Sequence, residues 1–319
     1  MSKAKGASVR RAEKRGIAGQ KGAALILLFL GLFLSGVTVV LTALNNRALQ
    51  LDRTLNLQRE MQDVREKLLA YAAMYPENYT TSSPNNGPGR LPCPDADNDG
   101  QENCTGTGLG RLPQFIDQTS GGMLGLSTLG IATDQQFWYA VHPNFWRTVT
   151  ATAVNSATTT TFTLDGGAQD VVALLIAPGE ALSGQTRSNS TATNYLEGGN
   201  ADVPTFFSVN NAAPAAFNDL VLPIRRAELM TLVTARVAQQ MKARLDVFHP
   251  ANGNTYPDVP AFAAALAGAS AWLADDNWAA VTTYSRVDAN NASVTFQNCG
   301  ITYTMTFGSA GLTRSQMAC

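Results

Sequence analysis

Residues 23–46 read AALILLFLGLFLSGVTVVLTALNN and contain no Asp, Glu, Lys or Arg. Because an α-helix rises about 1.5 Å per residue, a helix over this stretch is about 36 Å long. The apolar core of a bilayer is about 30 Å thick, so a helix of this length crosses it with some tilt. The sequence therefore predicts that the N-terminal part of the chain is held in a membrane.

Charge is distributed unevenly on the two sides of this apolar run. The first 22 residues hold seven of the 23 Lys and Arg residues and one of the 24 Asp and Glu residues. This leader therefore has a net charge of +6, and the other 297 residues have a net charge of −7. Flanks that stay in the cytosol are enriched in Lys and Arg. We expect a cytosolic leader and an exported remainder.

The helical pattern continues beyond the apolar run. Apolar side chains recur at steps of four, three, four, three and four residues, at Leu57, Met61, Val64, Leu68, Tyr71 and Tyr75. This spacing is close to the 3.5-residue repeat of a packed helical seam, and Pro76 ends it. A secretory signal peptide has a shorter apolar core followed by a cleavage site. We expect one helix over residues 23–75, with a transmembrane half, 23–46, and an amphipathic half, 47–75, that packs against protein.

A basic leader that ends in Gln20-Lys21-Gly22, followed by a helix that begins Ala23-Ala24-Leu25, resembles the type IV pilin and pseudopilin superfamily. The resemblance implies that a prepilin peptidase cleaves after Gly22 and that Ala23 is then methylated. It also implies a single-pass protein of a bacterial inner membrane, with a cytoplasmic N-terminus and a periplasmic pilin-like head. The implied partners are other pilins or pseudopilins and an inner-membrane assembly platform.

Two positions depart from the family pattern. Ala23 stands where a large apolar residue, usually Phe, opens the mature chain, and Leu27 stands where Glu is usual. In the family this Glu pairs with the charged amine of a neighbouring subunit inside an apolar bundle, where an unpaired charge is costly. Leu27 has no carboxylate, so the resemblance indicates a minor subunit at or near a filament tip. It does not separate a pilus, a secretion pseudopilus and a DNA-uptake fibre.

All four cysteines, Cys93, Cys104, Cys299 and Cys319, follow the apolar run. An even number of cysteines in an oxidising compartment indicates disulfides. Three pairings are open, and the local one, Cys93 with Cys104 and Cys299 with Cys319, is favoured because each pair brackets a short segment. Four buried thiols are the alternative. A zinc site is disfavoured because no two cysteines have the usual two-to-four-residue spacing.

An acidic segment follows the first cysteine. Asp95, Asp97 and Asp99 alternate before Gly100, a pattern that can wrap a hard cation such as calcium. The twelfth position of an EF-hand loop would be Gly106, which offers no carboxylate, so Glu102 is the candidate for a further ligand. The alternative is a solvated turn, for which Asp and Asn are typical.

The exported part, residues 76–319, is predicted to be a mixed α+β head with antiparallel strands. We expect strands at 137–141, 148–154, 158–164 and 171–177, and surface loops over 180–214. A second helix, with Pro223 in its first turn and its end at residues 249–250, precedes a meander over 279–307.

The head is expected to have two parts, residues 76–220 and residues 221–319. The order helix, Tyr-Pro pair and two cysteines occurs twice, first with Tyr75-Pro76 and then, within the second part, with Tyr256-Pro257. This order fits a duplicated module as well as a chance recurrence.

The sequence contains no recognisable set of catalytic residues. His142 and His249 each precede Pro, and neither has a nucleophile or carboxylate at a spacing typical of a catalytic site. The pair Asp275-Asp276 is interpreted as a solvated turn. Basic residues outside the leader are scattered over an acidic chain, so no nucleic-acid partner is expected. The prediction is a non-enzymatic minor subunit of a type IV pilus or type II secretion filament. The alternative is an uncleaved single-pass membrane protein with a ligand-binding or adhesive head.

Overall fold

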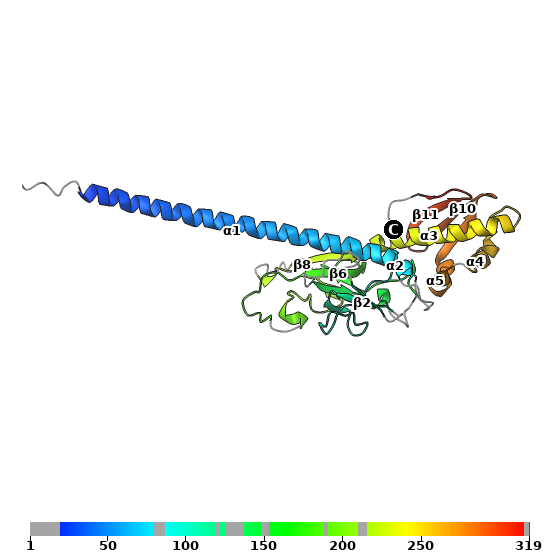
Figure 1. Ribbon diagram of the computed structural model, residues 1–319, viewed down its shortest axis with the longest axis horizontal. Helices are drawn as coiled ribbons and strands as arrows, with labels where there is room; N and C mark the ends of the chain where they lie inside the picture. Colours follow the sequence, from blue (N-terminus) through cyan, green and yellow to red (C-terminus); the bar gives the residue numbers. More distant parts are fainter. Residues whose placement is uncertain are drawn as a thin grey trace, which may run out of the picture. The chain divides into compact units, whose positions relative to one another are not determined.

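The computed structural model describes residues 20–78, 87–118, 122–125, 137–147, 153–187, 191–209, 216–268, 270–315 and 319. The chain divides into two compact units, Met1–Asn56 and Leu57–Cys319. One helix, α1 (Gln20–Ala73), begins in the first unit and continues into the second (Figure 1). The N-terminal leader, residues 1–19, lies outside the described residues.

In the first unit, α1 carries the apolar run. Leu25–Asn45 is the one helix in the described part of the chain that is long and apolar enough to cross a membrane, and none of it is buried. The predicted apolar helix is confirmed, although its backbone starts at Gln20 rather than at residue 23.

In the second unit, residues 57–73 of α1 pack against the rest of the head. The predicted seam is confirmed, since Met61, Val64, Leu68 and Tyr71 are at most 3% exposed. The helix ends at Ala73, two residues earlier than predicted, and a short helix, α2 (Tyr75–Asn78), follows after Met74. Pro76 fits at the start of this new helix because its missing N–H has no partner there to lose.

The first sheet has the strand order β1-β4-β6-β8, and all its pairs are antiparallel. Its strands are β1 (Leu109–Arg111), β4 (Trp138–Val141), β6 (Val171–Ala177) and β8 (Leu220–Arg225). Every residue of β6 is buried, which confirms a strand covered on both faces. One face of β6 lies in the main core, and the other lies in a smaller core with Trp138, Leu196 and Phe206.

The second sheet is the predicted meander, with the antiparallel order β12-β11-β10-β9. Its strands are β9 (Thr282–Arg286), β10 (Asn291–Phe296), β11 (Cys299–Thr306) and β12 (Leu312–Arg314). The second long helix, α3 (Arg226–Ala251), lies along β10 and β11 in Figure 1. Inward residues of α3 and of this sheet share one core with α1 and the first sheet.

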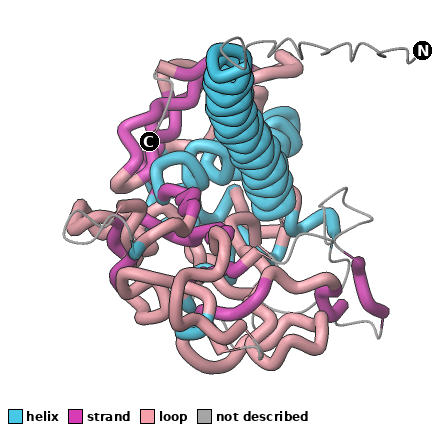
Figure 2. The backbone as a smooth tube through the Cα atoms, turned by 90° about the vertical axis from the view of Figure 1, so that its left-hand side faces the viewer, coloured by secondary structure: helices cyan, strands magenta, loops and turns pink. Residues whose placement is uncertain are grey.

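Short elements and loops complete the head, as the tube in Figure 2 shows. β2 (Phe115–Gln118) pairs with β3 (Gly122–Gly125), and β5 (Thr163–Leu164) pairs in parallel with β7 (Thr205–Phe206). Single helical turns are η2 (Pro143–Phe145), η3 (Ala192–Asn194), η5 (Val259–Ala261), α4 (Phe262–Ala265), α5 (Ala271–Asp275) and η6 (Trp278–Val281). The head is therefore α+β with antiparallel sheets and helices, as predicted.

Three local predictions are wrong. Pro223 lies in β8 and not in a helix, because β8 is an edge strand that tolerates the missing N–H. In the predicted strand 158–164 only β5 is a strand, and residues 148–152 lie outside the described part. Asp276 is fully buried rather than part of a solvated turn.

Candidate functional site

The largest exposed apolar surface in the described residues belongs to α1. Its large apolar side chains between Leu25 and Leu44 are 38% to 69% exposed, on all sides of the helix. Exposed apolar surface is unfavourable in water, and soluble monomers rarely carry so much of it in one place. This part of α1 requires a lipid or protein environment.

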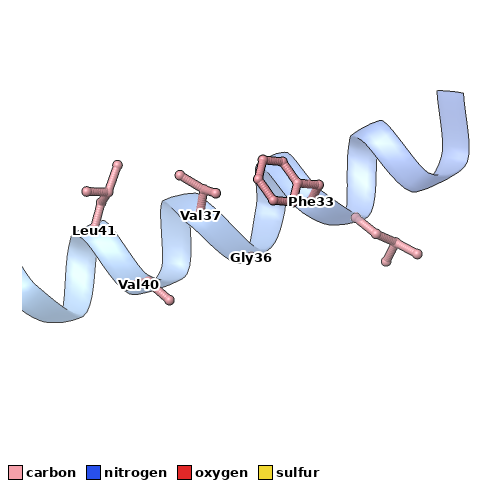
Figure 3. A pocket seen from close by; sticks show the side chains of 6 residues that line it. Phe33, Gly36, Val37, Val40 and Leu41 are labelled. Atoms are coloured by element: carbon pink, nitrogen blue, oxygen red, sulfur yellow. The ribbon is translucent and has the colours of Figure 1, made fainter. Parts of the chain in front are cut away.

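A shallow notch interrupts this surface at Gly36. Phe33, Val37 and Leu41 project from one side of the helix, one turn apart (Figure 3), and Leu32, Gly36 and Val40 complete the lining. A Cβ atom added at Gly36 would meet nothing within 4 Å. The notch is therefore formed by side chains of α1 alone.

The hydroxyl groups of Ser35, Thr38 and Thr42 find hydrogen-bond partners within the helix. The hydroxyls of Ser35, Thr38 and Thr42 donate to the carbonyl oxygens of Leu32, Ser35 and Thr38, at 2.8 Å each. In an apolar environment an unsatisfied hydroxyl is costly. These bonds make the run compatible with the interior of a membrane or of a helical bundle.

The residues of the expected cleavage site, Gly22 and Ala23, lie within α1. Leu27, at the position where the family usually has Glu, is 67% exposed. No charged side chain occurs between Lys21 and Arg47.

The structure joins Cys93 to Cys104 and Cys299 to Cys319, which is the local pairing that the sequence favours. The Cα atoms are 5.0 Å apart in the first pair and 4.4 Å apart in the second. The second bridge joins Cys319 to β11, and the N–H of Cys319 also donates to the hydroxyl of Thr231 on α3 at 2.8 Å.

A buried ion pair that the sequence did not reveal attaches the first disulfide loop, residues 93–104, to Arg147. Glu102 and Arg147, with side chains 2% and 10% exposed, approach to 2.6 Å. The other carboxylate oxygen of Glu102 accepts the N–H of Cys93 at 3.0 Å. Glu102 therefore lies beside the disulfide. It is not grouped with the three aspartates, so the prediction that it is a further cation ligand is not supported.

The three aspartates of the acidic segment are brought together. One carboxylate oxygen each from Asp95, Asp97 and Asp99 lies within 4.8 Å of the others. Asp95 is 3% exposed and accepts the N–H groups of Asn98, Asp99 and Gly100 at 2.6, 3.2 and 2.8 Å. Gly100 has φ +89°, which supplies the sharp turn.

These contacts fit two interpretations of the acidic loop. Burial raises the pKa of Asp95, its three backbone N–H bonds act against the shift, and nearby Asp99 adds to it. The backbone bonds alone stabilise a turn, as in the solvated-turn interpretation. The donor set, three carboxylates on a Gly-bent loop, also suits a hard cation such as calcium, with Asp97 and Asp99 exposed as further ligands.

A second feature absent from the sequence-based predictions is a cation stacked between aromatic rings. The guanidinium carbon of Arg111 lies 4.0 Å from the ring centroid of Trp138 and 4.5 Å from that of Tyr195. Arg111 is 7% exposed, and burial lowers its pKa. Desolvated contacts of this kind contribute about 2 kcal/mol. No pattern in the sequence around Arg111 predicts this stacking, because Trp138 and Tyr195 come from distant segments of the chain.

A buried ion pair joins residue 90 to the turn that follows α5 (Ala271–Asp275). Arg90 Nη2 lies 2.8 Å from Asp276 Oδ1, and the two side chains are 1% and 0% exposed. The N–H of Val154 donates to the same oxygen at 3.0 Å, and Asn155 Nδ2 donates to the backbone carbonyl of Asp276 at 2.8 Å. Burial raises the pKa of Asp276 to about 6, against the opposing effect of Arg90.

The two histidines have structural contacts. His142 Nδ1 accepts the N–H of Asn144, and its Nε2 lies 3.2 Å from the hydroxyl of Thr161. His249 stacks on Phe307 with centroids 3.8 Å apart and bonds Asn290 through Nε2. In the described part of the chain, these side-chain contacts of the two rings are with neutral groups.

No known protein family matches the chain, and neither a curated protein nor a solved structure matches it. The molecule is an apolar N-terminal helix, long enough to span a membrane, followed by an α+β head with two disulfides.

Proposed function

We propose that this protein is a minor pilin-like or pseudopilin-like subunit that is anchored in a bacterial inner membrane and assembled into a filament through α1. The main support for the proposal is that the two halves of α1 differ in exposure. Its first part, Leu25–Asn45, is apolar and exposed, while Met61, Val64 and Leu68 further along are core residues of the head.

The two halves of α1 imply two separate tasks. Residues 57–73 of the helix are attached to the head by the seam, and Arg65 also pairs with Glu228 of α3 and donates to the carbonyl of Pro223 at 2.9 Å. The first half offers apolar surface without charge. Membrane helices associate through van der Waals packing once they leave lipid, so this half could exchange lipid for sibling helices.

The environment proposed for the head is the periplasm. Two disulfides, each closed within the head, suit an oxidising compartment. The basic leader suits a cytoplasmic N-terminus.

A minor role is proposed because Leu27 replaces the usual Glu. A shaft subunit would bury this position beside a neighbour's charged amine, and Leu27 offers that amine no partner. A subunit at the tip makes contacts on fewer sides. We further propose that the head acts by binding and assembly and not by catalysis, since its buried charged groups are engaged in structural ion pairs and hydrogen bonds.

Processing of the N-terminus tests the proposal. The chain is produced in cells with and without an active prepilin peptidase, and its N-terminal mass is measured. The expected product begins at Ala23 and carries a methyl group. Gly22→Leu should leave the leader attached, whereas Gly16→Leu, a matched change within the leader, should not.

A chain that keeps Met1 in the presence of the active peptidase contradicts the proposal. That result favours the second candidate, an uncleaved single-pass protein with a ligand-binding or adhesive head. This second candidate is supported by Ala23, which differs from the large apolar residue that usually follows a prepilin cleavage site.

A further inference from the structure

A row of exposed apolar side chains on α1 runs past the end of the membrane span. Its members, which we call the outer seam, are Leu41, Leu44, Ala48, Leu51 and Leu55, at steps of three, four, three and four residues. The four leucines are 41% to 60% exposed, and Ala48 is exposed as well. Single exposed leucines are common on protein surfaces. This spacing, however, is the repeat of a coiled-coil seam.

Lipid does not reach the far end of the outer seam. The span Leu25–Asn45 is about 30 Å long, which fills the apolar core of a bilayer. Leu51 and Leu55 lie about 9 and 15 Å further along the helix than Asn45, whereas the headgroup region adds about 5–8 Å on that side. Neither leucine belongs to a described core of the head. Cover for these two side chains therefore has to come from another protein surface.

The row also continues back into the membrane span. Leu30, Leu34 and Val37 precede Leu41 at steps of four, three and four residues. In an apolar run this match carries little weight by itself, but the notch at Gly36 borders Val37 and Leu41 of the same row (Figure 3). Glycine lets a second helix approach closely in a membrane. The membrane part of the row is therefore also suited to a partner helix.

A second copy of this chain would meet the outer seam in a defined geometry. The basic leader orients every copy in the same way, so two copies in one membrane are parallel. In a parallel pair in register, each heptad position a or d faces the same position of the other copy. Ala48 and Leu55 then occupy position a, and Leu44 and Leu51 occupy position d.

The charges beside the outer seam favour a second copy as the partner. In a parallel coiled coil, position g of one helix lies opposite the position e that comes five residues later in the other. Position 47 of each copy thus lies opposite position 52 of the other, and the sequence has Arg47 and Asp52 there. Asp52 is exposed, and its carboxylate accepts the amide of Asn56 at 3.5 Å. By two-fold symmetry the opposite charges meet twice.

The neighbouring e and g positions bring no like charges together. Val40 faces Asn45 in the preceding pair of positions, and Thr54 faces Arg59 in the following one. Like charges at such positions would select against self-pairing.

We propose that two copies of this chain pair in the membrane as a parallel, in-register coiled coil along the outer seam, in which Asp52 of each copy meets Arg47 of the other. The pair rests on the membrane anchorage of the proposed function and names a partner for α1. It is two-fold symmetric and closes on itself, whereas a filament contact does not close. The pair is therefore distinct from a contact between successive subunits of a filament.

Cysteine cross-linking of the full chain in membranes tests the pairing. Two cysteines can be bridged only where their Cα atoms come within about 7 Å. Leu51→Cys lies at position d and should give a disulfide-linked dimer on a non-reducing gel after mild oxidation. Arg53→Cys lies at position f, on the outside of a coiled coil, and should give at least about fivefold less. The wild type is the blank, because its four cysteines are already joined.

Charge reversal identifies the partner as a second copy. In the Leu51→Cys background, Asp52→Arg places two like charges opposite each other and should lower the cross-linked fraction about two- to fivefold. Arg47→Asp/Asp52→Arg reverses both charges and should restore it. Arg53→Asp, a matched reversal at position f, should leave the fraction unchanged.

Equal cross-linking at positions 51 and 53 overturns the proposal. A double reversal that does not restore cross-linking also overturns it, because the partner of the outer seam is then a different chain. The cells used lack prepilin peptidase, so the result does not depend on processing. A cross-linked chain that keeps Met1 when the peptidase is supplied refutes the pilin-like function alone, and a processed chain that does not cross-link refutes the pair alone.

Discussion

Arg90 and Asp276 are 186 positions apart in the chain, yet they form an ion pair in which both side chains are buried. Arg90 belongs to a segment, residues 87–95, in which every residue is buried, and Asp276 directly follows α5. A Cβ atom on Gly87 would lie 1.7 Å from Asp276 Oδ2, so the backbone there approaches the carboxylate closely. The pair therefore joins two segments of the head that are far apart in the sequence.

Removal of one partner of this pair should destabilise the head strongly. In Asp276→Ala the guanidinium of Arg90 is left buried without its carboxylate, and such changes cost about 3–5 kcal/mol. Urea unfolding of the detergent-solubilised chain, followed by tryptophan fluorescence, measures the free energy. Asp258→Ala, which breaks the exposed pair with Arg286, should cost about 1 kcal/mol or less. Equal losses in the two variants would show that burial of the pair has no energetic role.

The stability of the head should fall between weakly acidic and neutral pH. Burial raises the folded-state pKa of Asp276 to about 6 and that of Asp219 to about 7, from 3.8 in the unfolded chain. The folded state therefore binds more protons, and stability is lost as the pH rises through these values, by at most about 1.4 kcal/mol per pH unit for each group. Urea midpoints at several pH values measure the slope. Asp219→Asn should reduce it, and a wild-type stability that rises with pH across this window contradicts the expectation.

The two disulfides should contribute similarly. They close loops with sequence separations of 11 and 20 residues, and chain entropy then gives about 3 kcal/mol for each. We expect this loss of unfolding free energy in Cys93→Ser/Cys104→Ser and in Cys299→Ser/Cys319→Ser. Alkylation of the unfolded, unreduced wild type should modify no cysteine. A full complement of reactive thiols in exported protein would refute the pairing.

The acidic loop is expected to bind calcium weakly. Asp95, Asp97 and Asp99 offer three carboxylates, while Glu102 is held by Arg147, so an affinity of about 10⁻⁴–10⁻³ M is expected. Calorimetric titration of the full chain with calcium measures it. Asp97→Asn/Asp99→Asn should abolish the heat, and Asp165→Asn, an acidic loop residue elsewhere, should not. No heat at millimolar calcium favours the solvated turn.

The parts of the fold that the sequence predicted depend on local periodicity. The seam from Met61 to Tyr71 follows from a repeat near 3.5 residues, and the seven apolar residues of β6 identify a strand covered on both faces. The meander β9–β11 follows from alternation. In each case neighbouring residues carry the signal.

The parts that were missed depend on contacts between distant segments. Pro223 suits a helix start and an edge strand equally well, and only the pairing of β8 with β6 decides between them. Asp276 has the appearance of a surface residue until Arg90 is placed beside it. The stack of Arg111 between Trp138 and Tyr195 likewise joins three separate segments, and no spacing in the sequence reports it.

On this proposal, the exposed half of α1 leaves lipid and packs among the helices of sibling subunits. The most direct measurement is the N-terminal mass of the chain recovered in a sheared-filament fraction from cells that contain an active prepilin peptidase. We predict that the fraction contains this chain and that the chain begins at methylated Ala23. If the chain is found only in membranes and still begins with Met1, the account is contradicted.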